Sequence, residues 1–288
     1  MAKPSPASAP KIVQFVNLWT MWDYPTAKRE WSLDRKFAAI KEAGFDAFGF
    51  MLEKEHARLA AKHGLRIVGA ISAAKTSEFR PLIEQCRDNG AERINCQLGD
   101  HDTSTEEAIR LAVRVIEEGE RAGVPVDVEV HRDTCTETPE KTYALAYGFK
   151  KATGRILPMT WDFSHLSCVK HLAPPYYERL LVDKKLIQHS RHFHFRPFNG
   201  HHCQIPVTDG NGRLSTELKQ WLPFLEKTLE LIATGSNDGR DIYVCPEMGP
   251  IRGGYNFAQL PNSFEDAKVL RPIIDRAWKK ALASRASA

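Results

Sequence analysis

The chain has 288 residues, of which 42% are hydrophobic and 26% charged, with a formal net charge of +4. This length suits one large domain, and basic and acidic residues are mixed along the chain, which disfavours a nucleic-acid-binding protein. No apolar run approaches the roughly 20 residues of a membrane span. We therefore predict a cytoplasmic protein without nucleic-acid or membrane partners. The modest positive balance would suit an anionic or phosphorylated substrate.

Residues 1–10 are rich in Ala, Ser and Pro and lack an apolar segment, so we predict a disordered tail and not a secretory signal. From residue 11 the chain alternates eight times between a short β-rich run and an amphipathic stretch. The predicted strands are residues 12–19, 47–51, 66–71, 93–98, 126–131, 159–163, 191–196 and 242–247. The predicted helices are residues 34–43, 53–63, 79–89, 105–121, 139–153, 176–187, 215–233 and 264–283.

Eight β-then-α units in one domain imply a parallel sheet. We predict an α/β protein, a (β/α)₈ TIM barrel over residues 11–288, because eight strands fit a closed barrel that leaves no edge. The alternative is a doubly wound open sheet, which usually has a Gly-rich loop after the first strand, whereas this chain has Trp19-Thr20-Met21-Trp22-Asp23 there. Residues 197–214 follow the seventh strand and are predicted to cover the barrel mouth as a binding loop.

The strand ends near the predicted mouth are unusually polar. Because side chains of a strand alternate between its two faces, the valines of the fifth strand and the phenylalanines of the seventh face the helices, and their polar neighbours face inward. The inward-facing polar residues are Asp127, Glu129 and His131 in the fifth strand, Asp162 in the sixth, His192, His194 and Arg196 in the seventh, and Glu247 in the eighth. Active sites of this fold lie at these strand ends.

Burying several carboxylates and imidazoles together is costly unless a cation compensates them. Glu129, Asp162, His194 and Glu247 come from four successive strands and form a mixed oxygen and nitrogen ligand set. Such a set suits one divalent ion and does not select among Mn²⁺, Mg²⁺, Co²⁺ and Zn²⁺. His192 shares a face with His194 and is the alternative ligand.

This pattern resembles the xylose-isomerase-like TIM barrels, which include sugar isomerases, ketose 3-epimerases and apurinic-site endonucleases. The matching features are Glu129 ending a strand, Asp162 and His165 in an Asp-x-x-His motif, the His-x-His of strand seven, and Glu247 ending strand eight. The resemblance implies metal ligands at Glu129, Asp162, His194 and Glu247. It also implies a substrate contact at His165. The segment that follows His194 departs from the ketose 3-epimerases, so substrate recognition is expected to differ.

We predict an isomerase or epimerase that acts on a sugar-like hydroxy-carbonyl compound through an enediolate stabilised by the metal. Glu129 and Glu247 are the predicted proton-transfer residues. The predicted substrate-binding residues are His131, His165, His192 and Arg196.

Three alternatives remain at this stage. A lyase or dehydratase acting on a keto-sugar or glycoside shares the first proton abstraction. The related nucleases need an Asp-x-His motif where this chain has Asp209-Gly210-Asn211, and a non-enzymatic ligand-binding barrel has no use for paired acids. Substrate stereochemistry, its phosphorylation, and association into homo-oligomers are not determined by the sequence.

Overall fold

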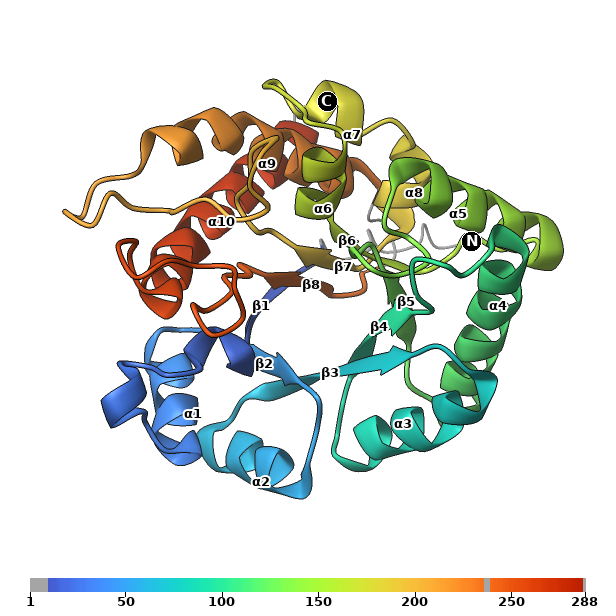
Figure 1. Ribbon diagram of the computed structural model, residues 1–288, viewed down its shortest axis with the longest axis horizontal. Helices are drawn as coiled ribbons and strands as arrows, with labels where there is room; N and C mark the ends of the chain where they lie inside the picture. The colour runs from blue at the N-terminus through green and yellow to red at the C-terminus, as the bar shows by residue number, and fades with distance from the viewer. Residues whose placement is uncertain (1–9, 236–238, 287–288) are drawn as a thin grey trace, which may run out of the picture.

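The computed structural model of the chain describes residues 10–235 and 239–286. Eight parallel strands close into a barrel in the chain order β1 to β8, and the helices surround it (Figure 1). Ile242 of the last strand lies opposite Ile12 of the first, so the sheet has no free edge. The predicted (β/α)₈ barrel is confirmed and the open-sheet alternative is wrong. The predicted tail lies outside the described residues, except for Pro10.

The predicted strands are all present, and each begins within one residue of its predicted start. They are β1 Ile12–Asn17, β2 Ala47–Phe50, β3 Arg66–Ala73, β4 Arg93–Leu98, β5 Val126–Glu129, β6 Met159–Asp162, β7 His192–His194 and β8 Ile242–Cys245. The carboxyl ends of β5, β7 and β8 come two residues earlier than predicted. His131, Arg196 and Glu247 therefore lie just beyond the sheet, on the segments that form the mouth.

The helices also follow the predicted order, with two differences. They are α1 Leu33–Glu42, α2 Lys54–His63, α3 Thr76–Asp88, α4 Thr105–Ala122, α5 Pro139–Thr153, α6 Phe163–Val169, α7 Tyr177–Leu180, α8 Lys184–His189, α9 Thr216–Gly235 and α10 Ser263–Ala286. The helix predicted over residues 176–187 is two short helices, because Asp183 caps α8 by accepting a hydrogen bond from the Leu186 N–H at 3.0 Å. The short helix α6 was not predicted. No helix within the described ranges is long and apolar enough to cross a membrane.

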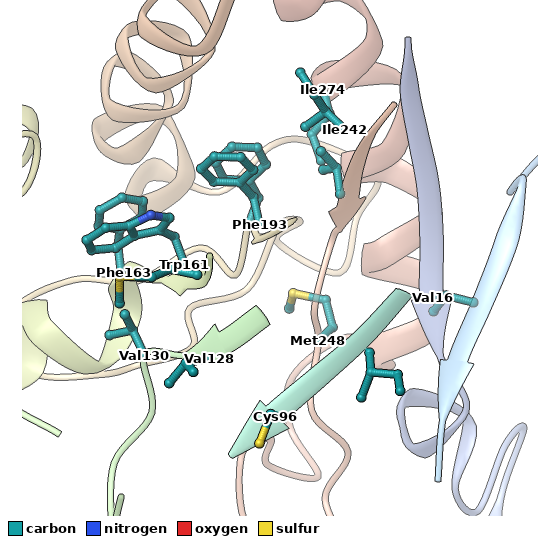
Figure 2. Close-up of a cluster of buried hydrophobic side chains, with 14 of the residues drawn as sticks. Val16, Cys96, Val128, Val130, Trp161, Phe163, Phe193, Ile242, Met248 and Ile274 are labelled. Atoms are coloured by element: carbon teal, nitrogen blue, oxygen red, sulfur yellow. The ribbon is translucent and has the colours of Figure 1, made fainter. Parts of the chain in front are cut away.

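The main hydrophobic core lies between the outer face of the barrel and the helices. Val128 and Val130, which flank Glu129 in sequence, belong to it, as do the rings of Trp161, Phe163 and Phe193 (Figure 2). The outward direction predicted for the valines and phenylalanines is confirmed. A separate, smaller apolar cluster fills the barrel interior below the mouth and consists of Val13, Phe15, Ala47, Val68, Tyr243 and Cys245. Together these two clusters fix the inward-facing polar side chains at the carboxyl ends of the strands.

The long segment of residues 197–214 packs against α10. Its Val207 and Thr208 N–H groups donate to the buried carboxylate of Asp266 at 2.7 and 3.2 Å, and the Thr208 hydroxyl donates at 2.9 Å. All residues of this segment are described, and none of them lines the pocket at the mouth. The prediction that it forms a binding loop is therefore wrong, since Asp266 holds residues 207 and 208 on α10 and Gln204 contacts the mouth only through its bonds to the backbone of Gly249.

Replacing Asp266 with Ala should destabilise the fold by about 1–3 kcal/mol, because it leaves buried N–H donors of residues 207 and 208 without an acceptor. Equilibrium unfolding in urea measures the change. Asp102→Ala is the control, since that side chain is 88% exposed in a loop and its loss should change stability by no more than about 0.5 kcal/mol. Equal effects of the two substitutions would contradict the anchoring role of Asp266.

Candidate metal centre

Four side chains converge at the mouth of the barrel. One ligand atom each of Glu129, Asp162, His194 and Glu247 can be chosen so that all lie within 4.8 Å of one another, and all four residues are buried. They come from or directly follow β5, β6, β7 and β8, and the register places Asp162 opposite His194. The convergence predicted from the strand pattern is present.

The contacts among these groups are close. Nδ1 of His194 lies 3.0 Å from Oε1 of Glu129 and 3.2 Å from Oε2 of Glu247. The guanidinium of Arg196 contacts Glu247 and lies 3.4 Å from Oδ2 of Asp162. One imidazole and one guanidinium therefore face three carboxylates.

Two side-chain amides hold the outer oxygens of the glutamates. Asn17 donates from Nδ2 to Oε1 of Glu247 at 2.8 Å, and Asn95 donates from Nδ2 to Oε2 of Glu129 at the same distance. Each glutamate is thereby fixed through one oxygen. Asp162 is oriented differently, because its Oδ1 accepts the Ser164 N–H at 3.0 Å as the N-cap of α6. This capping explains why a helix begins at this point.

The electrostatic environment keeps the acids ionised. Burial raises the pKa of Asp162, but the positive charge of Arg196 opposes it and brings the pKa down to about 2. Burial also raises the pKa of Glu129 and of Glu247, but neighbouring positive groups outweigh this effect. His194 holds the pKa of Glu129 below its usual range, and Arg196 together with His194 does the same for Glu247. Burial lowers the pKa of His194, yet the charge of Glu247 and the contact with Glu129 raise it to about 10.

The cluster fits a divalent cation. Oδ2 of Asp162 is buried and accepts no hydrogen bond from the described residues, which is costly for an ionised carboxylate. A cation among the three carboxylates would supply the missing partner, and the imidazole would give up its proton to become a ligand. Hard oxygen ligands with one imidazole suit Mg²⁺, Mn²⁺, Co²⁺ or Zn²⁺ and do not select among them.

A second polar layer lies beneath the cluster. Arg93 donates to both carboxylate oxygens of Asp127 at 2.7 and 2.6 Å, and His192 Nδ1 lies 3.5 Å from the same carboxylate. Burial lowers the pKa of His192 to about 4, so this imidazole is neutral. The structure therefore brings His194, and not His192, into the four-residue cluster.

The other predicted substrate-binding residues lie at different depths. His131 and Arg196 line the mouth pocket, whose volume is about 310 Å³. His165 and His192 do not line it: His165 is buried behind His131, with ring centroids 4.3 Å apart, and its Nε2 lies 3.3 Å from Asp162 Oδ2. His165 thus contacts the cluster from behind.

The pocket residues that sequence reasoning missed include the polar side chains of Asn17 and Tyr255. Asn17 shares the inward face of β1 with Phe15, so the period of two along the strand could have identified it. Tyr255 lies in the loop between β8 and α10 and carried no such pattern. Its ring packs against the Arg196 guanidinium, whose central carbon lies 4.4 Å from the ring centroid.

Comparison with known proteins supports the fold. No protein-family model matches the chain, and no curated protein matches it. Among solved structures, a D-tagatose 3-epimerase-like protein is 16% identical over 93% of this chain and 99% of its own, with a TM-score of 0.59. A xylose isomerase-like TIM barrel protein from Mycobacterium smegmatis in complex with magnesium is 16% identical over 96% of this chain and 99% of its own, at 0.55.

A third structure, the probable 3-DHS dehydratase AsbF from Bacillus anthracis, is 14% identical over 91% of this chain and 98% of its own, with a TM-score of 0.53. These likenesses extend over almost the whole barrel at low identity, so they establish the architecture and not the activity. The fold is a (β/α)₈ barrel, similar to that of solved structures that include a xylose isomerase-like TIM barrel protein.

Replacing Asp127 with Asn should destabilise the protein by about 3–5 kcal/mol, because it leaves the Arg93 charge buried without its partner. Urea unfolding measures the loss. Glu120→Gln is the matched control, since the pair of Glu120 and Arg155 is about half exposed and is expected to contribute no more than about 1 kcal/mol. A small effect at residue 127 would show that the buried pair of Arg93 and Asp127 does not stabilise the fold.

Proposed function

We propose that this protein is a divalent-metal-dependent isomerase or epimerase that acts on a sugar-like hydroxy-carbonyl compound. The observation that carries the proposal is the pair of glutamates, Glu129 and Glu247, which belong to one cation-sized cluster and line the same pocket. Neighbouring positive groups hold the pKa of each below its usual range. A barrel mouth with convergent polar groups of perturbed pKa is the expected place for catalysis in this fold. The metal ligands in this proposal are Glu129, Asp162, His194 and Glu247.

A cation bound at the cluster would act as a Lewis acid toward the substrate carbonyl and so acidify the adjacent C–H bond. One glutamate accepts the proton from that carbon, and the C–H electron pair forms the double bond of an enediolate. The same glutamate or the other one then returns the proton, to the opposite face in an epimerisation or to the neighbouring carbon in an isomerisation. Asn17 and Asn95 hold the outer oxygen of each glutamate and thereby limit its motion.

The surrounding polar residues have separate roles in this proposal. His131 on the pocket wall contacts a substrate hydroxyl, and Arg196, which also lines the pocket, orients Glu247. His165 positions Asp162 from behind. His192, which is neutral and buried, supports His194 from the lower layer and does not reach the pocket.

A lyase or dehydratase is the second candidate, favoured by the likeness to a probable dehydratase. It shares the proton abstraction and then expels a group from the next carbon, which needs a proton donor. Because residues 197–214 do not line the pocket, their histidines do not serve, and His131 is the histidine of the pocket wall that would donate. Release of an alcohol or water, or its absence, separates the two reactions.

The metal proposal predicts that Glu129→Gln and Asp162→Asn remove bound metal and activity together while the barrel stays folded. Each change withdraws one anionic ligand from the cluster, and metal affinity depends on deprotonated ligands. Elemental analysis of purified protein and circular dichroism provide the readouts. Active protein that contains no divalent metal would overturn the proposal.

The mechanistic proposal predicts that the enzyme exchanges a substrate C–H with solvent deuterium in a metal-dependent way. Glu247→Gln keeps the shape and one oxygen ligand but removes the base, so the rate should fall by roughly 10²–10⁴-fold. Mass spectrometry or NMR of substrate in D₂O measures the exchange. His165→Ala serves as the comparison, because it should weaken turnover but retain the metal. Product formed without solvent deuterium would indicate a hydride shift and contradict the two-glutamate mechanism.

A further inference from the structure

The pocket at the barrel mouth has two chemically different sides. The polar side is formed by β4, β5, β7 and β8 and the residues that directly follow them, with Asn95, Gln97, Glu129, His131, Arg196 and Glu247 facing the pocket. The other side is formed by the opposite arc of the barrel, β1 to β3, and is almost wholly apolar. Because the strands follow chain order around the barrel, the two sides face each other across the mouth.

The apolar side consists of large aromatic side chains, smaller aliphatic side chains and a glycine. Trp19 and Trp22 follow β1, Phe50 ends β2, and Val68 and Ala70 lie on the inward face of β3. Gly49 leaves space among them, since a Cβ there would come within 2.7 Å of Asn17 Oδ1 and 2.8 Å of the Phe15 ring. The result is a hollow beside the cluster, bounded by rings and methyl groups.

Tyr255 closes this hollow from the β8 side. Its ring meets that of Trp19 edge to face, with centroids 5.1 Å apart, and the Trp19 ring itself is packed against Gly249 and Gly253. Trp19, Trp22, Phe50 and Tyr255 all remain partly exposed toward the pocket. Partly exposed aromatic residues gathered around one cavity mark a site that buries an apolar ligand group.

The basic side chains near the mouth lie outside the hollow. Arg196 is the one Lys or Arg among the described residues lining the pocket, and it is paired with Glu247 and Asp162. Arg132 and Arg252 lie just outside, over the rings of Tyr255 and Trp22 at 4.4 and 5.1 Å. A phosphate in the hollow would lose water without gaining a charged partner, so the pocket disfavours the phosphorylated substrate that the net charge suggested.

We infer that the substrate is a keto-glycoside-like compound, with its oxidised sugar ring on the cluster and an apolar, ring-sized substituent in the hollow lined by Trp19, Trp22, Phe50, Val68 and Ala70. This inference rests on the proposed function, because it takes the cluster as the reacting end of the pocket. A free polyhydroxylated sugar would present hydroxyl groups to both sides and leave those in the hollow without hydrogen bonds. An aryl or other apolar aglycone meets only carbon surfaces there.

Calorimetric titration of the metal-loaded protein with phenyl β-D-glucopyranoside, methyl β-D-glucopyranoside, glucose and glucose 6-phosphate tests the inference. The phenyl glycoside should bind at least about tenfold more tightly than the methyl glycoside, since burying a ring in an apolar hollow contributes more than the 1.4 kcal/mol that a tenfold change in Kd represents. Glucose and its phosphate should bind no better than the methyl glycoside. Equal binding of the two glycosides, or tighter binding of the phosphate, would overturn the inference.

Ala70→Leu locates the effect, because it fills the hollow from β3 without touching the cluster. It should reduce the phenyl preference to less than about threefold while the metal content stays the same. Ala74→Leu is the matched control, since Ala74 is exposed beyond β3 and does not line the pocket; it should keep the preference. A phenyl preference that survives Ala70→Leu would place the ring elsewhere and refute the assignment.

The inference and the proposed function fail in different ways. A phenyl preference without any metal-dependent C–H exchange would sink the proposed reaction while the apolar subsite stands. Exchange with free ketoses and no phenyl preference would leave the reaction intact and remove the subsite.

Discussion

Three carboxylates buried within a few ångströms of one another are the constraint around which the mouth of this barrel is organised. Ionised acids in such a place repel each other and lose their hydration, so the fold has to supply compensating groups. Arg196 and His194 provide charge, Asn17 and Asn95 provide hydrogen bonds, and Asp162 still keeps one oxygen without a donor. A divalent cation bound at the cluster would complete this balance.

The closed barrel holds the buried acids in fixed positions relative to one another. Each acid is carried on or just beyond a separate strand, and the register of neighbouring strands sets all four ligands at one level. The pair of Arg93 and Asp127 with His192 below, and the apolar cluster around Phe15, form a rigid floor. Because interiors at this density deform little, the ligand geometry is prepared before any cation or substrate binds.

The same closure also divides the pocket. Strands β5 to β8 and the residues just after them carry the acids, His194 and Arg196, and Asn95 on β4 and Asn17 on β1 add amide donors. Apart from Asn17, β1 to β3 and the residues just after them line the pocket with aromatic, aliphatic and small side chains. Because the strands of this barrel follow chain order, residues from the two halves of the sequence line opposite walls of the pocket. The proposed catalytic groups lie on one wall and the apolar side chains on the other. The proposed activity and the inferred substrate class thus arise from one topological property.

Much of this was readable from the sequence, because local periodicity determines which face of a strand a side chain occupies. Alternation in β5 and β7 placed Glu129 and His194 inward and their valine and phenylalanine neighbours outward, and both placements are observed.

The sequence could not determine how deep in the barrel each inward-facing side chain lies, or which distant segments contact one another. His192 and His194 share a face, and only the stagger of neighbouring strands assigns the first to Asp127 and the second to the cluster. Likewise, the sequence predicted that residues 197–214 form a binding loop, but Asp266 on α10 holds residues 207 and 208, and Tyr255 lines the pocket instead. Such contacts are hydrogen bonds between segments that lie far apart in the sequence, so the local pattern of residues does not predict them.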